Sequence, residues 1–258
     1  MEELVSIIMP SYNTANFIGD AIMSVLAQSY DNWELLIVDD CSTDGTDAIV
    51  ESFLSDQRIH YLKNEKNSGA AVSRNRALEI ASGKWIAFLD SDDLWAKDKL
   101  RKQISFMKNN RYHFSYTQYA EIDVNGCETG IVVSGPSVIT KAGMYAYCWP
   151  GCLTVMYDAD CVGFIQIQPI KKNNDYAMWL KVCKTTSCYL CKEVLGYYRK
   201  GRNGSISSHN VVRLIKWHYL LFREVEKEHI AVALWHTGVN LVCGCWKKIR
   251  YVGESVNV

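Results

Sequence analysis

The chain has 258 residues and a net charge of zero, with 28 basic and 28 acidic side chains. This length is sufficient for one large α/β domain or two small ones with a buried core. The apolar fraction of 48% and the charged fraction of 22% exclude a disordered chain and one built mainly of membrane spans. Without excess positive charge, no nucleic-acid partner is expected, and any anion site must be built locally.

The amino-terminal sequence MEELVSIIMP lacks a basic region followed by an apolar stretch and a cleavage site. It therefore predicts no export signal. Ten cysteines in such a chain favour reduced thiols and a cytoplasmic location. Cys188 and Cys191 have zinc-like spacing, but Cys243 and Cys245 make a poor second pair. Core or half-buried thiols are the preferred interpretation.

The first 110 residues alternate between short β-branched runs and segments whose apolar residues have helical spacing. Strands are expected at Val5–Pro10, Glu34–Asp39, Ile59–Leu62 and Trp85–Leu89, with helices at Phe17–Gln28, Gly45–Leu54, Ala70–Ala81 and Lys97–Lys108. Strands this apolar, separated by helices, predict an α/β fold with a mostly parallel central sheet flanked by helices.

The pattern changes after about residue 110. Strands are expected at Tyr112–Asp123, Cys152–Tyr157 and Tyr189–Arg199, a helix at Asn174–Lys184, and helical sequence from about Val211 onward. No proline- or serine-rich linker separates the two halves. We therefore interpret residues 1–208 as one domain with halves 1–110 and 111–208, followed by a helical extension, 209–258.

The C-terminal region supports two interpretations. Apolar residues recur at helical spacing in Val211–Val225, and Ile230–Trp246 is apolar but too short and interrupted to predict a membrane span. Lys247, Lys248 and Arg250 follow. The segment is either a core helix that closes the domain, which we prefer, or a peripheral helix resting on anionic lipid at the inner face of the cell membrane.

Polar side chains follow three of the expected strands where each strand ends. They are Ser11-Tyr12-Asn13, Asp39-Asp40 and Asp90-Ser91-Asp92-Asp93. In an open parallel sheet these ends share one edge, where ligands bind. Five carboxylates at that edge would repel one another, so we expect Mg²⁺ or Mn²⁺ to neutralise them together with a diphosphate. For a single aspartate, and for Asp93 in particular, a helix cap or loop end is the alternative.

Two further features concern phosphate binding. The segment PSYNTANFIG after the first strand contains neither a Gly-x-Gly-x-x-Gly pattern nor a Walker A loop. Phosphates are therefore expected to be held by metal rather than by a glycine loop. Arg74, at the beginning of the third helix, is a candidate contact for a base or phosphate. A surface salt bridge is the alternative for Arg74.

The motifs VSIIMPSYN, VDDCSTDGT, GAAVSRN and FLDSDD, in this order and spacing, resemble family 2 glycosyltransferases with a GT-A (Rossmann-like) fold. Further along, NDYAMWLK resembles the acidic helix motif of that family, and YYRKGRNGSISS resembles its closing segment. The resemblance covers roughly residues 4–208. The variants present here look most like bacterial enzymes that build O-antigen or capsule repeat units.

The resemblance implies a nucleotide-sugar-binding role for the residues at the strand ends and Arg74: Pro10, Ser11, Tyr12, Asp39, Asp40, Arg74, Asp90 and Ser91. Asp40 would read the uracil ring, and Arg74 would help to hold the base. Asp92 would ligate Mn²⁺ or Mg²⁺, and Asp175 would be the catalytic base. The sequence departs from the family at Asn174, where a glutamate is usual, and near Arg202 and Asn203, where a histidine is common.

The resemblance implies an inverting, metal-dependent transfer of a hexose or N-acetylhexosamine from a UDP-sugar to a hydroxyl of a saccharide, carried on polyprenyl diphosphate. The halves 1–110 and 111–208 would then bind the nucleotide-sugar and the acceptor. Alternatives are a sugar-nucleotide nucleotidyltransferase, a receiver-like module and a non-catalytic sugar-binding module. The first normally has a glycine-rich basic loop, and a receiver would be about half this length.

Overall fold

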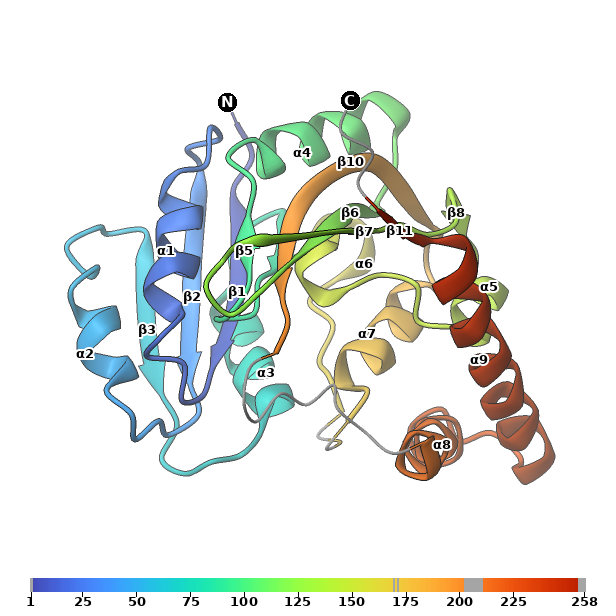
Figure 1. The fold of residues 1–258 in the computed structure, drawn as a ribbon. Helices are drawn as coiled ribbons and strands as arrows, with labels where there is room; N and C mark the ends of the chain where they lie inside the picture. The colour runs from blue at the N-terminus through green and yellow to red at the C-terminus, as the bar shows by residue number, and fades with distance from the viewer. Residues whose placement is uncertain (1, 169, 171, 202–210, 255–258) are drawn as a thin grey trace.

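The computed structural model describes residues 2–168, 170, 172–201 and 211–254. Within them, eleven strands form one sheet, and helices lie on both sides of it (Figure 1). The strand order of the sheet is β11-β7-β6-β9-β4-β1-β2-β3, and β10 pairs with β6 beside this path. The predicted α/β fold class is confirmed.

The amino-terminal half is a parallel sheet of four strands. These are β1 (Val5–Ser11), β2 (Trp33–Asp39), β3 (Ile59–Lys63) and β4 (Trp85–Phe88). The helices that connect and follow them are α1 (Ile18–Leu26), α2 (Thr46–Glu51), α3 (Ala70–Ile80) and α4 (Lys99–Asn110). Strand β1 is buried along its whole length, as expected for a strand whose sheet is covered on both faces.

The second half extends this sheet with mixed pairings. Its strands are β6 (Phe114–Ile122), β7 (Glu128–Val133), β8 (Val138–Ile139), β9 (Met156–Asp158) and β10 (Cys188–Arg199). The short strand β5 (Leu94–Trp95), from the first half, pairs with β10. Its helices are α5 (Lys141–Ala146), α6 (Ala159–Val162) and α7 (Asn174–Val182). Strand β9 is antiparallel to both β4 and β6 and so joins the two halves into one sheet.

The expected strand Cys152–Tyr157 is wrong in its first half. Residues Cys152–Thr154 form a turn of 3₁₀ helix, and the strand begins only at Met156. The cause is local, because both the backbone N–H and the hydroxyl of Thr154 donate to the carbonyl of Gly151, at 3.0 and 2.7 Å. These two bonds close a turn in a segment whose apolar composition favours a strand.

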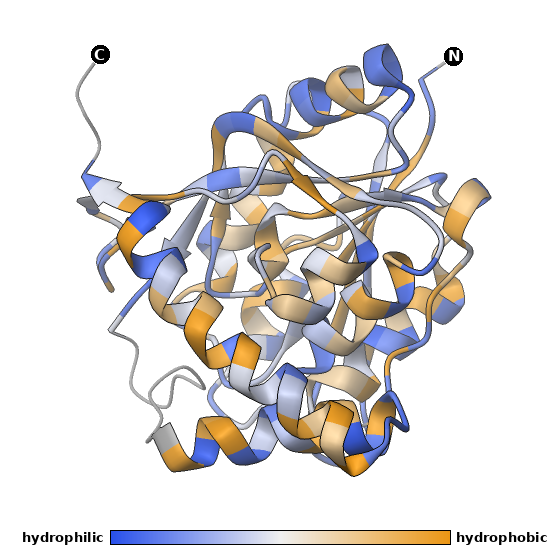
Figure 2. Ribbon diagram, turned by 90° about the vertical axis from the view of Figure 1, so that its right-hand side faces the viewer, coloured by the Kyte–Doolittle hydropathy of each residue, from blue (hydrophilic) through white to orange (hydrophobic). Residues whose placement is uncertain are grey.

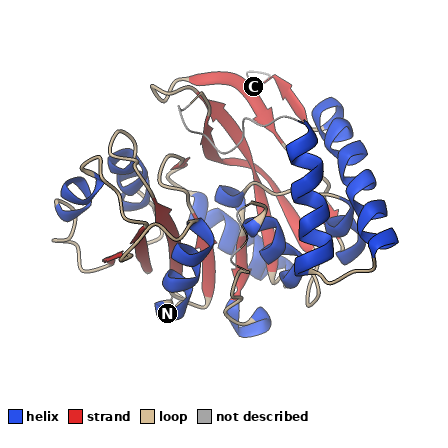
Figure 3. Ribbon diagram, turned by 90° about the horizontal axis from the view of Figure 1, so that it is seen from below, coloured by secondary structure: helices blue, strands red, loops and turns tan. Residues whose placement is uncertain are grey.

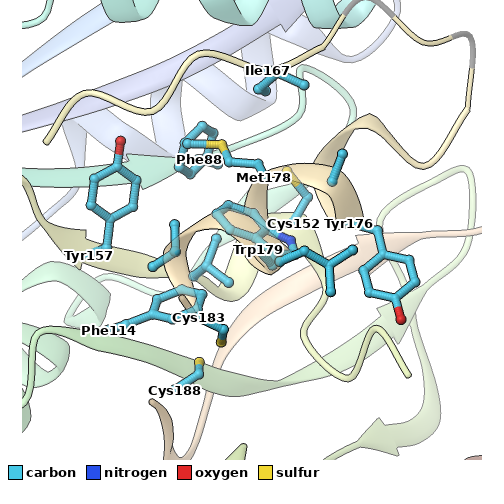
Figure 4. Close-up of a cluster of buried hydrophobic side chains, with 14 of the residues drawn as sticks. Phe88, Phe114, Cys152, Tyr157, Ile167, Tyr176, Met178, Trp179, Cys183 and Cys188 are labelled. Atoms are coloured by element: carbon cyan, nitrogen blue, oxygen red, sulfur yellow. The ribbon is translucent and has the colours of Figure 1, made fainter. Parts of the chain in front are cut away.

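Helix α7 is anchored in the core by Trp179, which is fully buried (Figure 4). Its ring meets Phe88 of β4 edge-on at 5.2 Å between centroids and Phe114 of β6 at 5.7 Å. Aromatic pairs of this geometry contribute about 1 kcal/mol each beyond the burial of their surface. The packing fixes α7, and therefore Asp175 in its first turn, against the carboxyl end of β4.

The C-terminal segment contains α8 (Val211–Leu220), a π-helical turn (Leu221–Val225), α9 (Ile230–Arg250) and β11 (Val252–Glu254). The preferred interpretation of Ile230–Trp246 as a core helix is confirmed only for one face, which buries Ala233, Thr237 and Asn240, because most of α9 is exposed. Strand β11 returns to the sheet and pairs antiparallel with β7. The division proposed at residue 208 lies outside the described residues.

Helices α8 and α9 lie at the opposite end of the molecule from α2 (Figures 1 and 3). In the part of the chain that the structure describes, no helix has the length and apolar character needed to cross a bilayer.

Candidate active site

The polar ends of β1, β2 and β4 lie at one edge of the sheet, as the sequence predicts. Ser11 is directly opposite Asp39 in the parallel pair β1–β2, and the backbone N–H of Asp40 donates to the carbonyl of Ser11 at 2.8 Å. On the other side of β1, the N–H of Leu89 donates to the carbonyl of Ile8, which places Asp90 beside the end of β1. The three strand ends therefore form a continuous rim.

The residues of β1 at this rim differ in accessibility. Pro10 and Ser11 are buried within the sheet, and the hydroxyl of Ser11 lies 2.8 Å from that of Thr14. Tyr12 is 46% exposed and is the first side chain beyond the strand that a ligand can reach. Asn13 has a φ of 49°, a backbone conformation that asparagine tolerates better than most residues. It turns the chain away from the rim.

Asp39 is fully buried and holds the loop that follows β2. It accepts hydrogen bonds from the backbone N–H of Ser42 at 3.0 Å and from the hydroxyl of the same residue. The ammonium group of Lys63 lies 3.9 Å from Oδ2 of Asp39, the oxygen that also accepts from the Ser42 N–H. A buried carboxylate needs such donors, so Asp39 shapes the rim from below.

Asp40 binds the loop that leads into α3. It accepts from the amide of Asn64 at 2.8 Å and from the backbone N–H groups of Ser68 and Gly69 at 2.8 and 2.7 Å. Gly69 has a φ of 89°, a conformation that costs a glycine little. Asp40 thereby ties β2 to the start of α3, the helix that carries Arg74.

Arg74 joins the two halves of the molecule. From the buried face of α3 its guanidinium donates to Oδ1 of Asp90, after β4, and to Oδ1 of Asn174, at the start of α7, both at 2.6 Å. The alternative of a surface salt bridge is confirmed for the ion pair, which Arg74 forms with Asp90, and wrong for its position, because only 7% of the Arg74 side chain is exposed. The planar guanidinium suits this bridging of two acceptors. Asp175 follows Asn174 directly, so this contact holds α7 close to Asp90.

The acidic cluster after β4 is unevenly exposed. Ser91 and Asp93 are buried, whereas Asp90 and Asp92 are partly exposed. Burial, together with the charges of Asp92 and Asp90, raises the pKa of Asp93 well above its usual range. Three carboxyl groups are thus close enough to repel one another, which favours a cation or a proton at this position.

Arg199, at the end of β10, is a site residue that the sequence interpretation missed. Its backbone N–H donates to Oδ1 of Asp93, and its Nε donates to the carbonyl of Asp92, both at 2.9 Å. Its Nη2 also lies 3.6 Å from a carboxylate oxygen of Asp20. The sequence feature that could have identified Arg199 is the Tyr198-Arg199 pair near the start of the closing motif YYRKGRNGSISS. Arg202 and Asn203 of that motif lie outside the described residues.

Asp175 occupies the first turn of α7, and its Oδ1 accepts from the backbone N–H of Tyr176 at 2.8 Å. Burial raises the pKa of Asp175 above its usual value, the nearby charge of Arg74 opposes the shift, and that of Asp90 adds to it. A carboxylate with a raised pKa, held near a second carboxylate, is typical of a proton-transfer group.

The five aspartates do not form one metal cluster. Among the described residues, no three His, Cys, Asp or Glu side chains come together as a metal site. Asp39 and Asp40 are occupied by their own loops, which corrects the expectation that all five would share one cation. Asp90 and Asp92 are the partly exposed carboxylates of the acidic cluster. They fit Mg²⁺ or Mn²⁺, which typically bind one or two carboxylates together with substrate phosphates.

The comparisons with known proteins agree with the motifs. A family model described as Glycosyl transferase family 2 matches residues 6–131. The chain is 44% identical over 234 residues to TuaG of Bacillus subtilis, whose name associates it with teichuronic acid biosynthesis; the match covers 90% of this chain and 92% of TuaG.

Two Escherichia coli relatives are also similar. The chain is 45% identical over 213 residues to WfgD, with 82% of each chain covered, and 37% identical over 239 residues to WfaP, with 92% and 94% covered. Both are named UDP-Glc:alpha-D-GlcNAc-diphosphoundecaprenol beta-1,3-glucosyltransferases.

Solved structures show the same fold. S. aureus TarS, residues 1–349 in complex with UDP-GlcNAc, superposes with a TM-score of 0.70 at 21% identity, covering 90% of this chain and 69% of that one. The mannosyltransferase PcManGT of Pyrobaculum calidifontis, in complex with GDP-Man and Mn²⁺, gives 0.65 at 16% identity, covering 95% and 76%.

The fold defines a GT-A enzyme, with a parallel amino-terminal half and a mixed second half. Sequence identity of 44% to TuaG over 90% of this chain then places the protein in a narrower class. The chain belongs to glycosyltransferase family 2, and it is a glycosyltransferase. The nucleotidyltransferase and receiver-module alternatives are therefore set aside.

Proposed function

We propose that this enzyme transfers a hexose or N-acetylhexosamine from a UDP-sugar to a hydroxyl of a polyprenyl-diphosphate-linked saccharide, in the synthesis of a bacterial surface polysaccharide. The names of WfgD and WfaP support the donor and acceptor classes, and the name of TuaG supports the kind of pathway. The observation that carries the proposal is the Arg74 bridge, because it brings the donor rim and Asp175 together.

The donor site follows from the rim. Asp40 faces the uracil ring in this proposal, and Arg74 lies beside the base. Pro10, Ser11 and Tyr12 pass beside the nucleotide; Asp39 supports the same site from beneath. Tyr12 is exposed and Asp90 is about one-third exposed, so both are accessible to a ligand. Ser91 adjoins the ribose position next to Asp90.

The donor diphosphate would be held with Mn²⁺ or Mg²⁺, with Asp92 as the protein ligand. Such an ion supplies charge stabilisation for the departing diphosphate when it is bound. Two observations support this assignment. The charges of Asp92 and Asp90 help to raise the pKa of Asp93, so the three carboxyl groups repel one another. The first strand is not followed by a glycine-rich phosphate loop.

Asp175 acts as the general base of an inverting displacement in this proposal. The acceptor oxygen forms a bond to the anomeric carbon as the bond to the UDP oxygen breaks. The acceptor proton passes to the Asp175 carboxylate, and the electron pair leaves with UDP. An α-linked donor thus gives a β-glycoside. The raised pKa of Asp175 makes the carboxylate a stronger base than an exposed aspartate.

The test is turnover of purified full-length protein with UDP-glucose, UDP-galactose and their N-acetyl forms. The acceptor is a synthetic GlcNAc-diphosphate carrying a short lipid chain, and each reaction contains Mn²⁺ or Mg²⁺. We expect one donor to give a β-linked disaccharide and release of UDP. Retention of the α configuration, or absence of transfer from every UDP-sugar while UDP itself fails to raise the melting temperature, would overturn the proposal.

A further inference from the structure

Helix α9 turns its large apolar side chains outward. Trp235, Val242, Trp246 and Ile249 are all exposed, Trp235 by 70% and Ile249 by 78%. They are separated by seven, four and three residues, so they share one helical face. Leu234, which is 57% exposed, borders the same face. Figure 2 shows the resulting hydrophobic bands along this helix.

The inward face of α9 carries smaller and more polar side chains. Its buried residues are Ala233, Thr237 and Asn240. Asn240 donates to the hydroxyl of Tyr176 at 2.9 Å, and Thr237 donates to the carbonyl of Ala233 at 2.7 Å. A surface helix of a globular protein normally shows the reverse arrangement, with its apolar stripe toward the core. Folding of the domain therefore does not account for the outward apolar face.

Helix α8, which packs beside α9, also carries exposed apolar side chains. Val212 is 70% exposed, and Leu214 and Ile215 are each 39% exposed. We call the outward apolar residues of both helices the α8–α9 face: Val212, Leu214, Ile215, Leu234, Trp235, Val242, Trp246 and Ile249. Large exposed apolar patches on a protein surface mark sites of contact with another protein or a membrane.

The charges on these two helices have one sign. Neither α8 nor α9 contains an aspartate or glutamate. Exposed cations are Arg213 and Lys216 on α8, and Lys248 and Arg250 at the end of α9. The acidic side chains of this region lie in the connection between the helices, 221–229. Basic residues beside an apolar helical face, with tryptophan among its members, are typical of helices that rest on anionic lipid.

The α8–α9 face lies next to the acceptor side of the active site. His218 of α8 packs against the ring of Tyr176 at 6.2 Å between centroids, and its Nδ1 lies 3.4 Å from the amide of Asn173. Both contacts flank Asp175 in the chain. In Figure 1, α8 lies on the side of the molecule toward which β1 and β2 run. A surface held by α8 would therefore be close to an acceptor at Asp175.

We propose that the α8–α9 face docks onto an anionic lipid bilayer, with its apolar side chains in the headgroup region and its basic residues against lipid phosphates. A second copy of the chain is a poorer partner, because a symmetric contact through this face would oppose like charges. The inference deepens the proposed function, since a polyprenyl-linked acceptor lies in a membrane. Docking itself, however, can be measured without donor or acceptor.

The experiment is flotation of the full-length protein with two kinds of vesicle, phosphatidylcholine alone and phosphatidylcholine with phosphatidylglycerol. We expect about tenfold more protein on the anionic vesicles, with the difference falling as salt is added. The fluorescence of Trp235 should shift to the blue on binding. Equal binding to both vesicles, or none to either, would overturn the proposal.

A matched pair of variants locates the contact. The triple change Trp235→Ser, Val242→Ser and Ile249→Ser should lower vesicle binding at least about tenfold. The control is Met23→Ser, Ile80→Ser and Val138→Ser, three exposed apolar residues on other elements, which should bind as the parent does. A control that loses binding equally would contradict the assigned face. So would a parent that is dimeric in solution and becomes monomeric in the first triple variant.

Charge is tested separately with Lys248→Gln and Arg250→Gln. Each should lower binding to anionic vesicles about fivefold and leave binding to neutral vesicles unchanged. All variants are also assayed with a water-soluble acceptor. Loss of vesicle binding with normal soluble turnover would be expected of the first triple variant. Failure of the parent to bind vesicles despite normal turnover would refute only this inference, and vesicle binding without turnover would refute only the proposed function.

Discussion

Arg74 and Asp90 form a 2.6 Å ion pair that is buried on the arginine side and partly open on the carboxylate side. The same guanidinium reaches Asn174, so one side chain links α3, the end of β4 and the start of α7. This link connects the donor rim to Asp175.

Replacing Arg74 should damage both stability and transfer. Arg74→Met leaves Asp90 and Asn174 without their shared donor, which should lower the free energy of unfolding by about 3 kcal/mol. Because α7 loses its link to the rim, kcat/KM should also fall at least about tenfold. Denaturant unfolding and initial-rate kinetics measure the two effects. Arg101→Met is the control, since that arginine pairs with Asp98 at the surface.

Removing the proposed base should abolish transfer and spare donor binding. Asp175→Asn keeps the shape and the acceptor for the Tyr176 N–H but cannot take a proton. We expect a rate loss of at least about a hundredfold with UDP affinity within about twofold of the parent. Asp160→Asn, an exposed carboxylate, should change neither quantity. Normal turnover in Asp175→Asn would refute the assignment.

The same residue predicts a pH dependence. Because burial raises the pKa of Asp175 above 3.8, the base becomes protonated, and inactive, at a higher pH than an ordinary aspartate. kcat/KM should therefore decline as pH falls through this raised pKa and be constant above it, until another group titrates. The profile is measured with saturating metal at each pH. A rate that rises toward acid would assign Asp175 a different role.

Asp92 should govern the metal dependence of donor binding. Asp92→Ala removes the proposed protein ligand, so UDP should bind with similar affinity in the presence and absence of Mn²⁺. The parent should bind more tightly with Mn²⁺ by about tenfold or more. Calorimetric titration with UDP measures this difference, and the metal-free titrations serve as the internal control. An unchanged response to Mn²⁺ would remove Asp92 as a ligand.

The contact between α9 and α7 can be isolated by a double-mutant cycle. Asn240 is buried and donates to Tyr176, whose hydroxyl donates to the carbonyl of Met144. Asn240→Leu should cost about 1–2 kcal/mol of stability in the parent and clearly less in a Tyr176→Phe background. Equal costs in both backgrounds would show that the hydrogen bond contributes nothing. Unfolding in urea measures each corner of the cycle.

Because of Lys99, the stability of the folded protein should rise as the pH increases. Lys99 is fully buried over the ring of Trp95, its Nζ has no hydrogen-bond partner among the described residues, and burial lowers its pKa to about 7. Between pH 7 and 10.5 the folded protein therefore binds fewer protons than the unfolded chain, so stability should rise with pH across this window. Lys99→Met should remove that rise and stabilise the protein by about 2 kcal/mol at pH 6. Lys97→Met, at an exposed position, should do neither.

The sequence by itself determined the elements of the first half and their common rim. Apolar runs such as VSIIMP and ELLIVD alternate with helical spacing, and this pattern allows few arrangements other than a covered parallel sheet. The strand ends then follow from topology, which explains why Ser11, Asp39 and Asp90 could be grouped without coordinates. The family motifs identified the class of enzyme for the same reason, since they are local in the chain.

Only the tertiary structure decided which polar groups bind which partners and which helical faces are covered. Asp40 and Asp92 look alike in sequence, yet Asp40 accepts from a loop more than twenty residues away, and Arg199 approaches Asp92 and Asp93 from more than a hundred residues away. The exposed apolar face of α9 is equally invisible to a periodic pattern, because periodicity shows that a helix has two faces without showing which one meets the protein. Hydrogen bonds and burial across such separations depend on how the elements pack, which composition and spacing do not specify.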